Sequence, residues 1–446
     1  MTPSGITYSV QPGWAEPPAD PAPALQGGIR CDVAVVGGGY AGMAAALRLA
    51  ERGVDVVLLE GGYCGGGASS RNAGQLTGAP AGDPEMLSAL YPRRFPRLVH
   101  LAEGAVRFTE ELMARLDTDC EYRPTGNIGA AVSKGQLRKA RRKARILKKA
   151  GADAEFGDAR DLGLPDSFLG GVHERAGGLL NPGAFALGIR EALLRSGARV
   201  FEGTPVRAVD PQGARVVVRT AGGHVRAERV VLATNAYSRA LAATPSRLAA
   251  PVFVSLVETE PIGPGRLEAT GWTSGAGIAT QHNLMESYRP TPRGTVVFGV
   301  RRLQPGRGAV REREPGAAVV TDLVRGFHAR FPSLRDIAPQ RAWGGWVALT
   351  PSWLPVAGEA ARNVFYMIGC NGHGLAQAPY LGTLLADRLA GDETHEDLAA
   401  VWRKRPSFAP SPVFNAPALR AVWAVDRLAD RLNSTGHAGP GKRDPS

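Results

Sequence analysis

The sequence predicts an α/β protein built from two domains. Residues 33–60 have the pattern of a buried strand, a glycine-rich turn, a helix and a second buried strand. Residues 252–257 and 295–298 instead alternate apolar and polar side chains, which is typical of strands in a mostly antiparallel sheet. With 446 residues, of which 44% are hydrophobic, the chain is too long for one compact core. We therefore expect a Rossmann-like domain beside a second domain with a mixed sheet.

The glycine-rich turn has the spacing of a dinucleotide site. Residues 33–36 form a short apolar run, as expected for a parallel strand that is buried on both faces. After this run, Gly37 makes the tight turn, Gly39 lets the backbone approach a pyrophosphate, and Gly42 lets the helix pack against the sheet. The residues of this turn that we expect to contact a cofactor are Gly37, Gly39, Tyr40, Ala41 and Gly42.

The helix and the second strand complete the pattern. The helix, from Met43 to about Arg52, directs its positive end and its free N–H groups toward the phosphates. The second strand ends at Glu60, 18 residues after Gly42, where a carboxylate accepts hydrogen bonds from a ribose 2′-hydroxyl. An acid here disfavours a 2′-phosphate, so the pattern predicts FAD or NAD and argues against NADP.

A second glycine-rich loop follows at residues 65–75, which read Gly-Gly-Gly-Ala-Ser-Ser-Arg-Asn-Ala-Gly-Gln. Small side chains let another stretch of backbone lie against a cofactor, with Ser69 and Arg71 placed for phosphate or ring contacts. A flexible surface loop has the same composition, so this segment alone leaves both interpretations open.

From Gly67 to Gln75 the loop resembles the sequence Gly-Ala-Ser-Gly-Arg-Asn-Gly-Gly-Gln of flavin amine oxidases in the D-amino-acid oxidase superfamily. Within that superfamily, the chain is most similar to the gamma-glutamylputrescine oxidase group. Ser70 and Ala73 replace two glycines of the usual loop. Further similar motifs follow in family order, at residues 181–182, 230–236, 287–290, 340–346, 354–358 and 368–374.

The resemblance implies that the cofactor is FAD. In this superfamily the helix after the turn at residues 369–374 directs its N-terminus at the pyrimidine edge of the flavin, which raises the reduction potential. Val206 lies where the family's adenine meets the backbone, although a core strand is an equally compatible interpretation. Besides the first turn and Glu60, the expected FAD contacts are Ala68, Ser69, Arg71, Asn72, Gly74, Gln75, Val206, Gly372, His373 and Gly374.

Two features of related enzymes are missing. Relatives such as monomeric sarcosine oxidase attach the flavin to a cysteine shortly before a Thr-Pro pair, but residues 343–349, before Thr350-Pro351, contain no cysteine. We therefore expect non-covalent FAD. These relatives also use a lysine above the flavin to activate O2, whereas this chain has no lysine between Lys149 and Lys404.

Four residues are candidates for catalysis, namely His373, Tyr288, Arg289 and Trp346. Arg289 beside Tyr288 could clamp a carboxylate bidentately, or the two could form a surface pair at a strand end. Trp343 and Trp346 could wall an amine, because a cation near an indole face gains about 0.5–2 kcal/mol, or they could be core aromatics. His373 could act on a proton, or it could only hydrogen-bond the backbone at a helix end.

The function that we expect is oxidation of a C–N bond in a small amine or amino acid to the imine. Hydride would pass to flavin N5, and O2 would be the acceptor. Arg301 and Arg302 point to an acidic group on the substrate, unless both face solvent. The alternatives are a dehydrogenase with another electron acceptor, a flavin enzyme acting on RNA, and a non-catalytic FAD-binding subunit.

The chain is basic, with 53 Lys and Arg against 41 Asp and Glu, and a net charge of +12. Residues 134–149 read as a basic helix that holds five of the seven lysines. Such a helix could bind nucleic acid, but no aromatic residue lies between its charges for base stacking, so we favour a solvated helix face.

The cysteine pattern and the hydropathy exclude other classes. Four scattered cysteines with no CxxC pair argue against a zinc site and against a disulfide framework. No apolar run approaches the ~20 residues of a membrane span, and the N-terminus lacks a signal pattern. We expect a cytoplasmic protein whose oligomeric state stays open.

The expected domain organisation divides the chain into several segments. An N-terminal arm over the surface comes first, both domains are discontinuous, and a helical extension precedes a disordered tail. The expected bounds are 1–29 for the arm; 30–80, 177–238 and 340–392 for the FAD domain; 81–176 and 239–339 for the substrate domain; 393–433 for the extension; and 434–446 for the tail.

Overall fold

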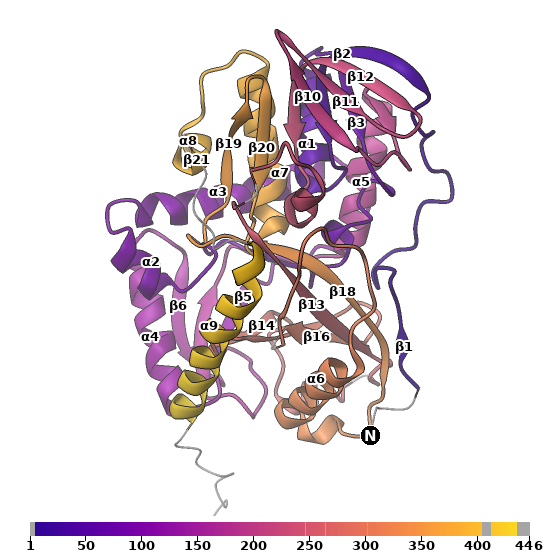
Figure 1. Ribbon diagram of the computed structural model, residues 1–446. Coiled ribbons are helices and arrows are strands. Elements are labelled where there is room, and N and C mark those ends of the chain that lie inside the picture. Colours follow the sequence, from indigo (N-terminus) through magenta and orange to yellow (C-terminus); the bar gives the residue numbers. More distant parts are fainter. Residues whose placement is uncertain (1–4, 246, 264, 301, 404–411, 435–446) are drawn as a thin grey trace, which may run out of the picture.

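The computed structural model describes residues 5–403 and 412–434 apart from residues 246, 264 and 301. It contains two large sheets, one in each domain (Figure 1). The predicted α/β fold, with a Rossmann-like domain and a discontinuous mixed-sheet domain, is confirmed. From residue 435 onward the expected tail lies outside the described residues.

The nine-stranded sheet belongs to the Rossmann-like domain. Its central strands run parallel, and β2 pairs with β3 on one side and with β12 on the other. The strands in spatial order are β21 (Trp402–Arg403), β19 (Val356–Ala361), β20 (Val364–Ile368), β12 (Gly223–Leu232), β2 (Gly27–Val36), β3 (Val56–Leu59) and β9 (Arg199–Phe201), and β11 (Arg215–Arg219) joins β10 (Ala208–Gln212) to β12.

The strands of this sheet are buried on both faces, as their apolar sequence predicts. Val33 and Val35 pack into the cluster formed by the helices, whereas Ala34 and Val36 pack into a second cluster with the β10–β11 hairpin. The helices on the first face are α1 (Tyr40–Glu51), α5 (Pro182–Arg195), α7 (Gly374–Leu389) and α3 (Phe95–Ala114), with the short α8 (Glu396–Val401) beside α7.

The ten-stranded sheet is mixed and mostly antiparallel, as the alternating sequence predicts. Helix α6 (Ala317–Arg330) covers one of its faces (Figure 1). The strands in spatial order are β1 (Thr7–Tyr8), β18 (Pro339–Leu349), β13 (Ala250–Thr259), β16 (Val296–Val300), β15 (Glu286–Pro290), β14 (Gly277–Thr280), β5 (Asn127–Ala131), β7 (Gly170–Glu174) and β6 (Ala154–Asp158), with β17 (Gln304–Pro305) on β13.

Two smaller groups of elements complete the fold. Strands β4 (Gln75–Thr77) and β8 (Gly177–Leu179) form a separate antiparallel pair. Helices α2 (Pro84–Leu90), α4 (Lys134–Lys149) and α9 (Pro412–Ser434) lie at the β6 end of the larger sheet, with α9 along α4 (Figure 1).

Strand β18 changes one expected domain boundary. The third cofactor segment was expected to begin at residue 340, inside this strand. Strand β18 instead pairs with β13 along its whole length, from Leu349 opposite Ala250 to Pro339 opposite Thr259. Residues 339–349 therefore belong to the substrate sheet, because their backbone hydrogen bonds are made there.

The N-terminal arm contacts both domains and is partly buried, so it does not merely lie over the surface. Strand β1 adds to the edge of β18, and the chain then runs up one side of the molecule to β2 (Figure 1). On the way Trp14 is buried, with 5% of its surface exposed. The amide of Ala22 donates to the Glu202 carboxylate, and Arg190 donates to the Asp20 carbonyl. The arm is thus held by both domains.

Two lysines of the basic helix α4 form ion pairs with acidic residues of the same chain. Lys139 pairs with Asp83 at 3.0 Å, and Lys143 pairs with Glu174 at 2.5 Å.

None of the helices that the structure describes has the length and apolar character needed to cross a bilayer.

The Arg190–Glu202 ion pair predicts a measurable stability effect. Both Glu202 oxygens accept from Arg190, at 2.8 and 2.9 Å, and both side chains are buried. Arg190→Met would leave a buried carboxylate unpaired and should lower the free energy of unfolding by about 3–5 kcal/mol in urea titrations. The control is Arg195→Met, which removes an exposed pair with Glu191 and should cost at most about 0.5 kcal/mol.

The pH dependence of the free energy of unfolding gives a second test of the Arg190–Glu202 pair. Burial favours the neutral acid, but the hydrogen bonds from Arg190 and from backbone amides outweigh it and lower the pKa of Glu202. The stabilisation is therefore present above the pKa of the unfolded state and is lost as the pH falls through the lowered folded value. An equal cost for both variants, or a pH-independent cost, would contradict this assignment.

Candidate functional site

The first glycine turn has the close contacts that its spacing predicts. Gly37 has φ +109°, and a Cβ on Gly42 would lie 1.9 Å from the Gly37 carbonyl oxygen. Gly39 caps α1 without a side-chain hydrogen bond. The first turn of α1 therefore presents backbone N–H groups at the end of β2, which is the arrangement that binds a pyrophosphate.

Glu60 lies directly after β3, beside this turn. Its carboxylate accepts hydrogen bonds from the amide of Gly38 at 2.7 Å and from the amide of Gly62 at 2.8 Å. Burial raises the pKa of Glu60, and these amides act in the opposite direction. Each carboxylate oxygen retains acceptor capacity, so the position fits the predicted ribose contact.

The 67–75 loop packs against the first turn. It begins with a short 3-10 helix, η1 (Ala68–Ser70), and the hydroxyl of Ser69 accepts a hydrogen bond from the amide of Tyr40 at 3.0 Å. Asn72 donates back to the carbonyl of Ser69 at 2.7 Å and accepts from the amide of Gly74 at 2.9 Å. The structure thus brings Tyr40, Ser69 and Asn72 together, as predicted for one cofactor site.

Arg71 organises the 67–75 loop from within. It is buried and donates to the carbonyls of Gly66, at 2.9 Å, and Gly344, at 3.3 Å. Its guanidinium also lies 3.4 Å from the Glu312 carboxylate, whose pKa is raised by burial. Arg71 therefore joins the loop to β18, and its predicted cofactor contact would come in addition to these bonds.

The turn before α7 forms the second edge of the site. Asn371 has φ +51°, and its side chain accepts from the Thr350 amide at 2.7 Å. His373 is the N-cap of α7, with Nδ1 3.3 Å from the Asn371 carbonyl and a pKa that burial lowers. Gly372 and Gly374 flank it, so the three predicted residues of this turn lie at the free N-terminus of the helix.

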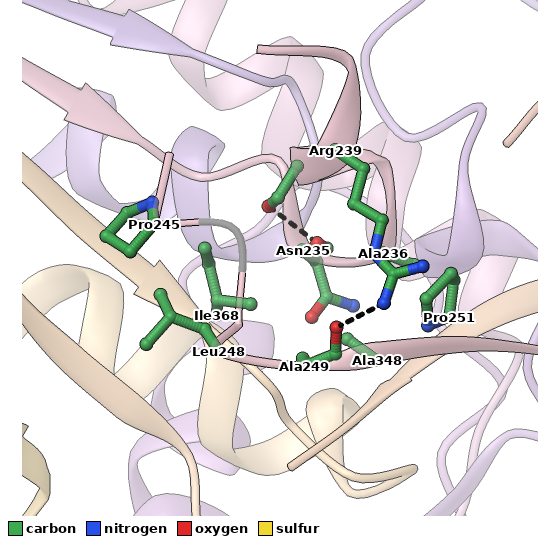
Figure 2. A pocket seen from close by; sticks show the side chains of 10 residues that line it. Asn235, Ala236, Arg239, Pro245, Leu248, Ala249, Pro251, Ala348 and Ile368 are labelled. Atoms are coloured by element: carbon green, nitrogen blue, oxygen red, sulfur yellow. Dashed lines mark hydrogen bonds between the residues drawn. The ribbon is translucent and has the colours of Figure 1, made fainter. Parts of the chain in front are cut away.

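A small pocket lies behind this turn, beside the 3-10 helix η2 (Asn235–Ala240) (Figure 2). Asn235 accepts from the amide of Gly369 at 3.0 Å, and Arg239 donates to the Ala249 carbonyl at 3.4 Å. Ala348 and Ile368 complete the apolar wall that Figure 2 shows. None of the predicted site residues lines this pocket.

Strand β15 separates two residues that were predicted to act together. Consecutive side chains of a strand point to opposite faces. Tyr288 packs with Phe298 and Phe331 under α6, and its hydroxyl donates to Glu286 at 3.1 Å. Arg289 points to the other face, toward the 67–75 loop. The structure therefore does not place Tyr288 in a clamp with Arg289.

Strand β18 separates the two tryptophans in the same way. Trp346 donates to the Arg311 carbonyl at 2.9 Å and packs edge-on against Phe253. Trp343 lies on the opposite face and donates to the Arg71 carbonyl at 3.2 Å. The tryptophan that meets the 67–75 loop is thus Trp343, whereas the catalytic candidate Trp346 lies among core side chains.

The remaining predicted residues have varied surroundings. Val206 is partly buried against the cluster that contains Leu59. Gln75 donates to the Tyr288 carbonyl at 3.2 Å, so it connects the loop to β15. Arg302 is exposed and pairs with Asp322 at 2.6 Å, and Arg301 lies outside the described residues.

Sequence reasoning missed Trp14. Its indole N–H donates to the Asn72 carbonyl at 2.7 Å, and its ring lies edge-on to Trp343. The one signal in the sequence was a large aromatic residue in an otherwise proline-rich and polar arm.

Comparisons with known proteins agree with this geometry. The family model described as DAO, FAD dependent oxidoreductase, matches residues 32–388. The chain belongs to the DAO family of FAD-dependent oxidoreductases. The chain is 30% identical over 421 residues to gamma-glutamylputrescine oxidoreductase of Escherichia coli (strain K12), covering 92% of this chain and 96% of the relative. The predicted family, the enzyme class and the cofactor FAD are thereby confirmed.

Solved structures share the fold of this chain. The crystal structure of glycine oxidase from Geobacillus kaustophilus superposes with a TM-score of 0.72 at 25% identity, over 84% of this chain and 99% of that structure. L-amino acid deaminase from Proteus myxofaciens has the same TM-score at 18% identity and covers 91% of this chain and all of its own length.

The residues of the site fit FAD. The turn at residues 37–42 leaves no room for a side chain at its closest point, the N-terminus of α1 is free, and Glu60 lies at the end of the next strand. These groups would hold the pyrophosphate and the ribose. The 67–75 loop and the N-terminus of α7 would hold the flavin.

Gly42→Ala tests this fit. The new methyl group would collide with the Gly37 carbonyl, so the turn must open and the purified protein should contain little FAD. The measurement is the ratio of heat-released FAD to protein. The control is Gly104→Ala in α3, where a Cβ would meet nothing closer than 3.7 Å. This substitution should stabilise the helix by about 0.5–1 kcal/mol and leave the FAD content unchanged. Full FAD content in Gly42→Ala would contradict the fit.

Proposed function

We propose that this protein oxidises the C–N bond of a small amine or amino acid that also carries a carboxylate. The observation that supports this most is Arg289. It is buried to 1% exposure, lies against the 67–75 loop, and its Nε and Nη2 have no hydrogen-bond partner among the described residues. A buried guanidinium with two unused donors matches the geometry of a carboxylate.

The names of two relatives agree with this substrate class. The relatives are gamma-glutamylputrescine oxidoreductase and glycine oxidase, and both named compounds contain an amine and a carboxylate. We extend this chemical class, but neither compound, to the present chain. Arg302 takes no part in the proposal, since it pairs with Asp322 at the surface.

FAD, held by the turn at residues 37–42, Glu60, the 67–75 loop and the N-terminus of α7, would supply the redox chemistry, namely hydride acceptance at N5 from the carbon next to the amine, with O2 as the final electron acceptor. The chain positions the substrate. Arg289 holds the carboxylate. His373, neutral because burial lowers its pKa, donates from Nδ1 to the Asn371 carbonyl and keeps Nε2 as an acceptor for the substrate amine.

A dehydrogenase with a different acceptor is the second candidate. The absence of a lysine between Lys149 and Lys404 favours it. Lys143 of α4 is bound to Glu174 at 2.5 Å, so that ammonium is already committed to an ion pair. Whether O2 or another compound accepts the electrons is tested by the rate at which air reoxidises the reduced flavin.

The proposed function predicts selective reduction of the flavin. Purified protein is mixed without oxygen with amines in matched pairs that differ only by a carboxylate, and the flavin absorbance is followed. The carboxylate-bearing member should bleach the flavin faster, because Arg289 binds it. Recovery within seconds in air would indicate an oxidase, and recovery only with a quinone or dye would indicate a dehydrogenase. Bleaching by none of the amines would refute the proposal.

We also propose that FAD is held without a covalent bond. Residues 343–349 offer no cysteine, and Cys370, which lies in the turn before α7, is a poor nucleophile because burial raises its pKa. Acid denaturation should release all FAD, and mass spectrometry should give the mass of the polypeptide alone. A mass increase equal to FAD would contradict this, and its loss in Cys370→Ala would locate the bond.

A further inference from the structure

We propose that the N-terminal arm is part of the substrate site, with Trp14 as a positioning residue that holds the Arg289 guanidinium ready for a carboxylate. The inference rests on the proposed function, since it assigns the arm to the same carboxylate subsite. It concerns a segment outside the region that the family model matches, which begins at residue 32.

One edge of the Arg289 guanidinium is fixed by backbone carbonyls. Nη1 donates to the carbonyl of Leu180 at 2.5 Å and to those of Ala73 and Gly74 at 3.3 Å. The opposite side, Nε and Nη2, meets no acceptor in the described parts of the chain. The guanidinium is thus anchored at one nitrogen and leaves two N–H donors for a ligand.

The charges around Arg289 favour the binding of an anion. Burial and then the neighbouring cation Arg123 lower the pKa of Arg289 to about 9, and Glu121 only partly offsets them. The acid Glu258 is already bound by Arg293 at 2.8 Å and by Arg341 at 2.5 Å. A substrate carboxylate would therefore supply the negative charge that this buried cation lacks.

Trp14 fixes the plane of this guanidinium. Its ring centre lies 4.5 Å from Cζ of Arg289, which is cation–π distance, and its N–H is bound to the Asn72 carbonyl. Trp343 also packs against this indole in an edge-on arrangement, with ring centres 5.8 Å apart. Trp14 is therefore a rigid surface that faces the cation and is tied to the 67–75 loop.

The arm is built to hold Trp14 in this place. The amide of Ser9 donates to the Ala342 carbonyl at 2.9 Å, and Arg341 donates to the Gly13 carbonyl at 3.1 Å. A Cβ on Gly13 would lie 2.6 Å from the ring of Trp343, so the backbone before Trp14 runs directly against that indole. These contacts lead the arm into the site between β18 and the loop.

The experiment compares Trp14→Met with Trp14→Phe. Phenylalanine keeps an aromatic face over Arg289, methionine fills similar space without one, and both lose the N–H bond to Asn72. With the flavin-loaded enzyme, KM for the carboxylate-bearing amine should rise about tenfold in Trp14→Met and less than about threefold in Trp14→Phe. KM for the matched amine without a carboxylate, and kcat for both, should change less than about twofold.

The control is Trp272→Leu, which removes a buried tryptophan that donates to Ala276 and stacks on Phe331, in the core of the substrate domain. It should lower the melting temperature and leave the ratio of the two KM values unchanged. Equal rises for both substrates, or equal effects of Met and Phe at position 14, would overturn the positioning role.

A binding measurement separates this inference from the proposed function. Butyrate is titrated calorimetrically into the flavin-loaded wild type, Arg289→Lys and Trp14→Met. The subsite is supported if the wild type binds butyrate and both variants bind it about tenfold more weakly, even if no amine reduces the flavin. Failure of the wild type to bind butyrate, or unchanged binding in Trp14→Met, overturns it.

Discussion

Four consecutive carbonyl groups of the 67–75 loop connect the parts of this molecule. The carbonyl of Arg71 accepts from Trp343, and that of Asn72 accepts from Trp14. The next two, of Ala73 and Gly74, accept from Arg289. The donors come from β18, the N-terminal arm and β15, which are distant in sequence. Because a buried carbonyl without a donor costs roughly 1–3 kcal/mol, the loop keeps its shape only when all three segments are in place.

The same contacts relate the FAD-binding half of the site to the substrate half. The first glycine turn reaches the loop through the amide of Tyr40 and the hydroxyl of Ser69. On its far side, Arg71 bonds β18 through the Gly344 carbonyl. A displacement of the loop would thus alter both the cofactor cradle and the position of Arg289, which is how a substrate contact and a cofactor contact become interdependent.

The parts of the site that the sequence predicted correctly are those fixed by near neighbours in the chain. The strand, turn, helix and acid from residue 33 to Glu60 follow from glycine spacing and from apolar runs, and the structure has them in that order. The mixed second sheet likewise follows from the alternation in residues such as 252–257. Local patterns of this kind are determined by backbone sterics and by burial, and both can be read over short windows.

Long-range pairing accounts for what the sequence did not predict. Alternation implies that Trp343 and Trp346 point to opposite faces of a strand, but not which face meets the cofactor. That choice depends on the pairing of β18 with β13 and on the position of α6, which covers the face that carries Tyr288. The role of Trp14 is even harder to predict from the sequence, because its partners Asn72, Arg289 and Trp343 lie far along the chain from the arm.

The position of β1 has a consequence for how the protein is made. Thr7 pairs with Arg341, and Trp14 packs on Trp343, so both contacts join residues that are far apart in the chain. Such contacts between distant residues form late, because a long loop must close before they can stabilise anything. The strand-turn-helix unit of residues 27–59 can form early from its own sequence. The arm, in contrast, must wait for β18, so the substrate side of the site is completed only after β18 has been synthesised and has joined its sheet.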